Sequence, residues 1–483
     1  MQRSVGMVVA MVVAVGSSGC GNPCGSGTVD QNGKCVASCG PGTALSGGKC
    51  VLAPDVCGAG TVLSEAQHAC VSEAAAFDES PTPWSQNVRV SPSGVWAAEP
   101  SMAVDREGRL FVAAMYQADS AVSAVVATLD ESDDGGKTWK TALSEQSKHD
   151  GGFTGDVSVA VDASDNVYFA YIDYASSSSQ GQYPPGDIWV QVSDDHGQTF
   201  TGVKVNQDNG NYFCDRPWLA QGPNGEMVVS FTYQDNGSNA SLYGFSVFDS
   251  TDQGADWQFL GDVEKTLYQQ NIYTDGQFPT ARSKNGYLIP RLTYENVMQG
   301  TPDMYLDVYR TTDFNNYDRA RIAKIFYDPR TLTVDAMAVP AVAPNQNVYL
   351  AYLNAVSRNI DLSVVTSTDG GATFSPPVDV DRLPGAATEA MPWLSIDPST
   401  GALNLIFIDN HTGEWMVVGA RSTDGGKSFE LTRVSDKTFV EDSSQTKWLG
   451  DFNAVAIGDG KTCAVWTDTR DGKSAIYLSC RQG

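Results

Sequence analysis

A short pattern of the form Ser-x-Asp-x-Gly-x-[Thr/Ser/Asp]-[Trp/Phe] recurs five times along the chain. The copies are Ser132-Asp134-Gly136-Trp139, Ser193-Asp195-Gly197-Phe200, Ser250-Asp252-Gly254-Trp257, Ser367-Asp369-Gly371-Phe374 and Ser422-Asp424-Gly426-Phe429. A sixth, degenerate copy contains Thr311, Asp313, Asn315 and Tyr317 and is one residue shorter. Successive Asp positions are 55 to 61 residues apart. A regular period of this size predicts a propeller or a solenoid.

The residue types of the pattern indicate a turn. Short Ser and Asp side chains accept hydrogen bonds from nearby backbone N–H groups. Glycine adopts a positive φ without steric cost, and asparagine is the usual substitute. The aromatic residue that follows is expected to be buried beneath the turn.

This pattern is identified as the Asp box of the BNR repeat, and the chain resembles the sialidase-like β-propeller superfamily over roughly residues 86–483. In that family the boxes join the outer two strands of each blade, away from the ligand face. The resemblance therefore implies an all-β fold and a purely structural role for every box.

The composition agrees with a protein of strands and turns. Only 18% of the residues are charged, glycine occurs 47 times, and 483 residues are ample for a large core. The formal net charge of −26 argues against nucleic acid as a partner, because phosphates would be repelled. An acidic surface is compatible with calcium sites and with export.

The N-terminus is typical of an export signal. Arg3 provides a positive charge, and the apolar stretch 6–16 is too short to span a bilayer, so residues 1–19 are interpreted as a signal peptide. Small residues lead into Cys20, as in a bacterial lipobox, although Ser17 stands where leucine is usual. We expect cleavage before Cys20 and lipid on its thiol. The alternative is ordinary cleavage with Cys20 in a disulfide.

Six of the ten cysteines form three small repeats within residues 20–70. Their internal repetition favours the pairs Cys24–Cys35, Cys39–Cys50 and Cys57–Cys70. Each loop of about a dozen residues could contribute roughly 3 kcal/mol in the chain-entropy account. Zinc binding is the competing interpretation, but this segment has no Cys-x-x-Cys pair. A Cys463–Cys480 bridge would leave only Cys214 unpaired.

Residues 71–85 are acidic and contain two prolines, and they are interpreted as a linker. Six box-bearing units then occupy about 98–436, and 447–480 repeats the pattern without a box. That last segment supplies three strands, and residues 87–91 can supply the fourth, closing the ring without open edges. We therefore predict seven blades. The alternative is six blades with 447–480 as a cap.

Ligands of propellers bind where the inner strands begin. Polar residues expected there are Glu99, Asp156, Asp215, Arg216, Asp275, Glu389 and Asp451. At the far ends of the second strands lie Asp173, Asp235, Arg291, Asp409, Asp468 and Arg470. The repeated acidic residues have two interpretations: they coordinate calcium near the axis, or they bind backbone N–H groups of the neighbouring blade.

The resemblance to sialidases implies three arginines for a carboxylate, a Tyr–Glu nucleophile pair and an acidic proton donor. The best available set is Arg216, Arg291 and Arg470, with Asp156, Glu389 and Asp451 as acidic candidates. The usual signature of the first arginine is absent, because Ile289-Pro290-Arg291 has the wrong order. The adjacent Tyr294 and Glu295 would point to opposite faces of a strand. The alternative is that Arg216 and Arg470 bridge acidic loops of neighbouring blades.

Tryptophans after strand-initial positions, Trp218, Trp393 and Trp448, could offer platforms to sugars, but their recurrence favours packing between blades. We therefore expect an exported, surface-anchored monomer that binds a glycan or protein ligand on the top face of the propeller, with a membrane contact only through its lipid. An exo-sialidase-type glycoside hydrolase is the enzymatic alternative, and a scaffold of the cell envelope is the third. The sequence indicates no metal ligands and no cofactor, with calcium left open.

Overall fold

The computed structural model describes six short strands between residues 28 and 72, residue 77, and residues 82–482. From the last range 118–124, 177–183, 207–211, 236–242, 298–301, 326–336, 357–358, 382–387 and 443–448 are left out. The chain divides into two compact units, Met1–Ala76 and Phe77–Gly483. The boundary falls inside the segment 71–85. Within the described residues, no helix has the length and apolar character needed to cross a membrane.

The first unit contains three two-stranded hairpins, one in each cysteine repeat. They are β1 (Thr28–Gln31) with β2 (Lys34–Ala37), β3 (Thr43–Ser46) with β4 (Lys49–Leu52), and β5 (Thr61–Ser64) with β6 (Ala69–Ser72). The second cysteine of each repeat occupies the same place in the second strand. The signal peptide, Cys20 and the three expected disulfides lie outside the described residues and side chains.

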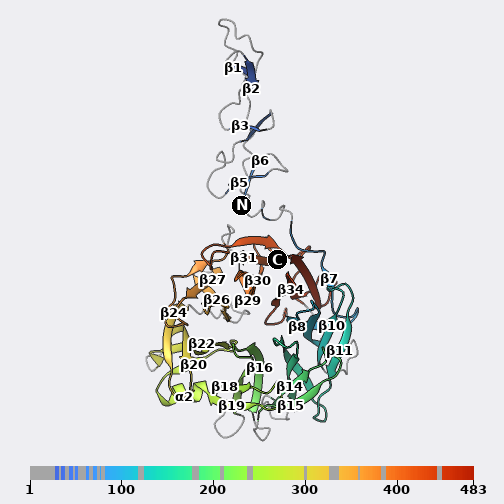
Figure 1. Cartoon of the computed structure of the whole chain (residues 1–483), viewed down its shortest axis with the longest axis vertical. Coiled ribbons are helices and arrows are strands. Elements are labelled where there is room, and N and C mark those ends of the chain that lie inside the picture. Colours follow the sequence, from blue (N-terminus) through green and yellow to red (C-terminus); the bar gives the residue numbers. More distant parts are fainter. Residues whose placement is uncertain are drawn as a thin grey trace, which may run out of the picture. The chain divides into compact units, whose positions relative to one another are not determined.

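The second unit is a ring of seven antiparallel sheets, which confirms the prediction of a seven-bladed β-propeller (Figure 1). Blade 1, from the inner strand outward, comprises β8 (Trp96–Val104), β9 (Leu110–Gln117), β10 (Val126–Ser132) and β11 (Lys140–Glu145). Blade 2 comprises β12 (Phe153–Val161), β13 (Val167–Tyr174), β14 (Gly186–Ser193) and β15 (Thr201–Lys204). Blade 3 comprises β16 (Tyr212–Gln221), β17 (Met227–Asp235), β18 (Tyr243–Ser250) and β19 (Gln258–Asp262).

Blade 4 has an interrupted inner strand, so it counts five strands. They are β20 (Tyr273–Asp275), β21 (Ala281–Ser283), β22 (Gly286–Glu295), β23 (Asp303–Thr311) and β24 (Asp318–Ile325). Blade 5 comprises β25 (Ala338–Val342), β26 (Val348–Val356), β27 (Asn359–Ser367) and β28 (Val378–Asp379), and blade 6 comprises β29 (Glu389–Ile396), β30 (Leu403–Asp409), β31 (Met416–Ser422) and β32 (Glu430–Arg433).

Blade 7 is built from both ends of the propeller sequence, as expected. Strands β33 (Ala454–Gly458), β34 (Lys461–Asp468) and β35 (Ala475–Gln482) are completed by β7 (Val88–Arg89). Strand β7 pairs with β35 through Tyr477↔Arg89 and Leu478↔Val88. Cys463 and Cys480 face each other across β34 and β35 and form the predicted disulfide.

The last two residues of the segment expected to be a linker, 84–85, contact the blades of this unit. The Ser85 N–H donates to the Cys480 carbonyl at 2.8 Å. Trp84 is only 7% exposed and packs with Ile406, Val417 and Val434 of blade 6. Residues 84–85 therefore belong to the propeller and help to close its ring.

The second strands are apolar over most of their length because blades cover both of their faces. All eight residues of β13 are buried, as are all seven of β30. Such continuous burial gives long apolar runs in place of the alternation seen in half-exposed strands.

Each repeated pattern forms the turn between the third and fourth strands of a blade. In the first copy the Ser132 hydroxyl donates to Asp134 Oδ1 at 2.8 Å and accepts the Gly136 N–H at 2.9 Å. The Thr138 hydroxyl donates to Asp134 Oδ2 at 2.6 Å, and this bond is the main reason that the pKa of Asp134 is below its usual range. The degenerate copy has the same kind of contact, because the Asn316 side-chain amide donates to Asp313 and lowers the pKa of Asp313 to about 2. These carboxylates therefore accept hydrogen bonds within the turns to which they belong and stabilise those turns.

A short helix that the sequence analysis did not anticipate connects blades 3 and 4. Helix α2 (Val263–Gln269) follows β19, and Asp262 caps it by accepting the Lys265 N–H. The helix buries Val263, Glu264 and Leu267. The described part of the chain is therefore nearly, but not entirely, β-structure.

Candidate functional site

The innermost strands of four blades share an irregularity at the same place. The pairing with the second strand shifts at Ala98/Ser101, Gly155/Ser158, Asp215/Trp218 and Ala390/Trp393. Each shift holds one non-glycine residue with a positive φ, namely Glu99 (58°), Asp156 (46°), Arg216 (51°) and Met391 (51°). A left-handed conformation costs a non-glycine residue on the order of 1–3 kcal/mol. Four repetitions of such strain indicate bulges that re-aim side chains.

These bulges explain why prolines follow three of the four strained residues. Pro100, Pro217 and Pro392 stand directly after the left-handed position. Proline has no N–H to lose where the ladder is already interrupted. These prolines lie inside the inner strands, because β8, β16 and β29 begin three to five residues before them.

An ion pair crosses the middle of the ring. Arg216 Nη2 in blade 3 lies 2.5 Å from Asp451 Oδ2, just before blade 7. Blades 3 and 7 are not neighbours, so this contact places both side chains at the propeller axis. The two side chains are 10% and 31% exposed.

Three more carboxylates belong to the same group, which we call the axial cluster: Glu99, Asp156, Asp215, Arg216 and Asp451. Glu99 Oε1 accepts the Asp451 N–H at 3.0 Å. This approach needs Gly450 (φ 87°), since a Cβ there would lie 2.9 Å from Glu99 Cγ. The cluster therefore joins blades 1, 2, 3 and 7.

Side chains at its edge orient the remaining carboxylates. The Tyr174 hydroxyl donates to Asp156 Oδ2 at 2.8 Å, and Gln277 Nε2 donates to Asp215 Oδ2. Burial, and then the charge of Asp156, raise the pKa of Tyr174 well above its usual value. Tyr174 and Gln277 were not anticipated, since an isolated Tyr or Gln carries no signal in one sequence.

The axial cluster has four carboxylates for one guanidinium, so it retains protons. Burial raises the pKa of Glu99 well above its usual value, and the charges of Asp451 and Asp156 raise it further. Burial and the charge of Asp156 likewise raise the pKa of Asp215. Neighbouring carboxyls of this kind titrate as a unit. The cluster thus favours a carboxyl that keeps its proton beside groups that accept hydrogen bonds.

An aromatic group lies on the axis beside the cluster. Trp218 contacts Trp393 at 5.3 Å and Phe452 at 4.9 Å between ring centroids, which joins blades 3, 6 and 7. Trp218 is 3% exposed and donates its indole N–H to the Gln277 carbonyl at 2.8 Å. It is therefore a packing residue rather than a sugar platform. Trp448 lies outside the described residues.

A separate cavity of about 570 Å³ lies among the ends of the inner strands of blades 3 to 6. Its lining includes Gln221, Arg282, Pro340, Gln346 and Trp393. Trp393 thus faces this cavity while it also contacts Trp218.

The other two arginines of the expected trio are held elsewhere. Arg291 is fully buried, pairs with Glu264 of α2, and lies 4.4 Å from the Phe245 ring centre. Burial lowers its pKa. Arg470 is 5% exposed and pairs with Asp468 at 2.6 Å and with Asp436. The three arginines therefore form ion pairs with different carboxylates, and only Arg216 takes part in the axial cluster.

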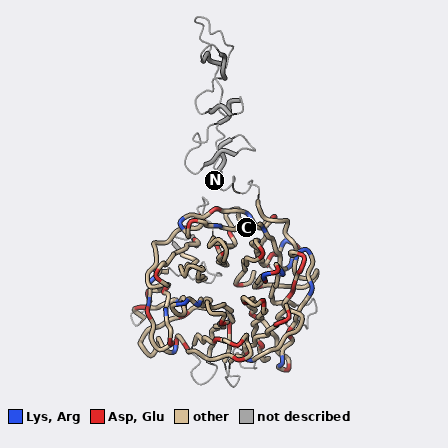
Figure 2. The backbone as a smooth tube through the Cα atoms, viewed as in Figure 1, with Lys and Arg blue, Asp and Glu red and all other residues tan. Residues whose placement is uncertain are grey.

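The remaining candidates are distributed over several blades. Asp156 and Asp451 lie in the axial cluster, whereas Glu389 lies in blade 6 opposite Asp409. Asp173 accepts the Lys148 N–H, and Asp275 is exposed on β20. The side chain of Asp235 is outside the described part. Charged residues of both signs are mixed around the ring (Figure 2).

Known proteins resemble this chain in fold only. No model of a known protein family matches it, and no curated protein matches it either. A protein of unknown function from Dyadobacter fermentans is 12% identical, covering 83% of this chain and 99% of its own, with a TM-score of 0.48.

Two glycoside hydrolases are also among the similar structures. The Hadza microbial sialidase Hz136 is 12% identical over 80% of this chain and 66% of its own, with a TM-score of 0.46. The GH93 α-L-arabinofuranosidase of Fusarium graminearum is 12% identical over 83% of this chain and 98% of its own, with a TM-score of 0.47. With TM-scores below 0.5, these likenesses carry no argument about function.

Proposed function

We propose that the protein binds a polyhydroxylated ligand, a glycan, at the axial cluster. The observation that carries this proposal is the convergence of charged side chains from four blades on one point, in three of those blades through strained bulges. Strained backbone that aims polar side chains at a common point is more frequent at ligand sites than in purely structural positions.

The chemistry of the cluster suits sugar hydroxyls. A hydroxyl both donates and accepts, and the cluster offers ionised carboxylates, protonated carboxyls and a guanidinium within a small space. Asp451 is 31% exposed, so a ligand can reach it from solvent. The surplus of carboxylates disfavours a negatively charged ligand, including a sialic acid.

Binding to immobilised glycans tests this proposal. We expect the propeller fragment 77–483 to retain neutral or amino sugars on a glycan array, and Asp156→Asn and Asp451→Asn to weaken this retention at least tenfold. Asp318→Asn, an 80% exposed side chain on outer strand β24, is the matched control. Retention that survives both axial substitutions would refute the assignment of the site.

Glycoside hydrolysis is the second candidate. It is favoured by the raised pKa of Glu99 beside Asp156 and Asp451, since an acid and a base of different pKa are what glycosidases use. Release of reducing sugar from a retained glycan, abolished by Glu99→Gln, would establish it. The sialidase form is disfavoured, because Arg291 and Arg470 are buried in other ion pairs.

We also propose that the protein is exported and attached to a bacterial membrane through lipid on Cys20. The signal-like residues 1–19 support this proposal. Labelling of cells with a fatty-acid analogue should mark the wild-type protein and not Cys20→Ser, and the substituted protein should appear in the soluble extracellular or periplasmic fraction. Equal labelling of both would refute it.

A further inference from the structure

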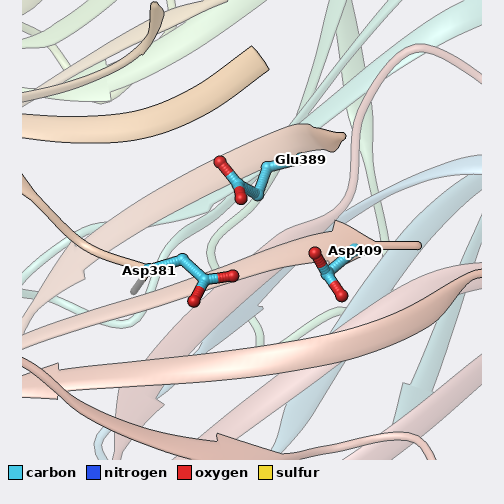
Figure 3. A group of neighbouring side chains, drawn as sticks. All are labelled: Asp381, Glu389 and Asp409. Carbon is cyan, nitrogen blue, oxygen red and sulfur yellow. The ribbon is translucent and has the colours of Figure 1, made fainter. Parts of the chain in front are cut away.

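Three carboxylates meet between blades 5 and 6, away from the glycan site proposed above. Glu389 is the first residue of β29, Asp409 is the last of β30 and stands opposite it, and Asp381 follows β28. One oxygen of each lies within 4.8 Å of the others. Figure 3 shows the three side chains turned toward a common space. The sequence analysis did not identify Asp381, because this residue follows the fourth strand of blade 5 and candidate site residues were sought only near the first two strands of each blade.

Two of the three carboxylates are buried, so water compensates their charges little, while Asp381 is half-buried. Glu389 is 3% exposed and Asp409 is fully buried. Burial raises the pKa of Glu389 to about 9, and the charges of Asp381, Asp361 and Asp409 act in the same direction. Three acids enclosed together would repel one another strongly if all were ionised.

One oxygen of Asp409 has no hydrogen bond. Asp409 Oδ1 accepts the backbone N–H of His411 at 3.0 Å and also contacts His411 Nδ1. Asp409 Oδ2 is buried and has no partner. A buried carboxylate oxygen without a hydrogen bond destabilises the fold, so its presence calls for a ligand.

The surrounding contacts hold the carboxylates in place. His411 fixes Asp409, and the Leu362 N–H of β27 donates to Glu389 Oε2 at 2.5 Å. Metal ligands are commonly oriented by such outer hydrogen bonds. The Leu362 contact also ties blade 5 to blade 6 at this point.

We propose that Asp381, Glu389 and Asp409 bind one calcium ion that joins blade 5 to blade 6. The donors are all oxygens, as calcium requires. Calcium accepts carboxylate oxygens in flexible geometries, whereas magnesium demands near-ideal octahedral geometry and usually keeps several waters, which a mostly buried group of three carboxylates does not favour. The ion provides the partner that Asp409 Oδ2 lacks. This proposal does not depend on glycan binding.

Calorimetric titration of EDTA-treated protein with calcium chloride tests the proposal. We expect the wild type to bind one equivalent more than Asp409→Asn or Glu389→Gln, and magnesium to bind at least tenfold more weakly. Glu414→Gln, an exposed acid of the same blade, is the matched control and should titrate as the wild type does. Equal stoichiometry and affinity in wild type and both variants would overturn the proposal.

Thermal unfolding gives a second measurement that does not depend on heats of binding. Calcium at about 100 times its dissociation constant should raise the Tm of the wild type by roughly 3 °C. Asp409→Asn should melt at or above the wild-type temperature in EDTA, because it removes a buried charge, and should not respond to calcium. A variant that melts lower in EDTA and still gains the full calcium shift would show that the carboxylates are only structural.

Discussion

Replacement of Trp84 by alanine should open the ring of the propeller at blade 7. The indole is 93% buried against blade 6, and its N–H donates to Thr432 Oγ1 at 3.0 Å. A buried tryptophan removes on the order of 200 Å² from water, which corresponds to about 5 kcal/mol. The hydrogen bond adds about 1 kcal/mol. Because the site collapses in part after truncation, we expect a loss of about 4 kcal/mol.

Calorimetry and hydrogen exchange would measure this effect. Unfolding entropy of about 2.1 cal/mol/K per residue over roughly 400 residues converts 4 kcal/mol into a Tm decrease of about 5 °C. Amides of β35 should lose protection, since the residues that follow Trp84 in the chain cover that strand edge. Trp84→Phe keeps most of the buried area and should lose less than half as much. A Tm change below 1 °C for Trp84→Ala, with β35 still protected, would refute the view that this segment closes the ring.

Three further predictions concern the same propeller. Alanine at both Cys463 and Cys480 should cost about 3 kcal/mol, from a loop of 17 residues, and calorimetry should find the same loss in reduced wild type. Burial makes the folded protein bind the Glu99 proton more tightly than the unfolded chain does, so denaturant unfolding should show stability falling as pH rises above the ordinary pKa of 4.5. Glu99→Gln should make this slope shallower, while Asp215 and Glu389 keep part of it. Gly371→Ala should lower the Tm more than Gly401→Ala does. Both glycines have a positive φ, but only at Gly371 would the new Cβ meet a neighbour, Leu288 Cδ2 at 2.5 Å. Equal decreases in Tm would contradict this reasoning.

The repeat spacing was sufficient to predict the ring and its closure. Six box-bearing units and a seventh without a box imply seven sheets, and residues 87–91 resemble the strand after the last box. The pairing of Arg89 with Tyr477 confirms that inference. The position of Cys463 opposite Cys480 followed from a hairpin turning near Thr469. Both predictions rest on local patterns that one sequence displays.

The composition of the candidate sites was predicted only in part. Glu99, Asp156 and Asp451 were expected near the axis, but a sequence does not show that bulges turn Glu99 and Asp156 inward. Arg291 was misplaced as a ligand residue because its partner, Glu264, lies in a seven-residue helix too short to give a periodic signal. Which charges neutralise one another depends on contacts between distant blades, and spacing along the chain does not contain that information.

The sharing of blade 7 between β7 and β35 has a consequence for biogenesis. The segment that carries β7 is synthesised before any of the other strands of the ring, yet its partner β35 follows all six of the other blades in the chain. Blades 1 and 6 must therefore each keep one face uncovered until β33 to β35 have been synthesised. A chain truncated before β33 would leave that gap in the ring open.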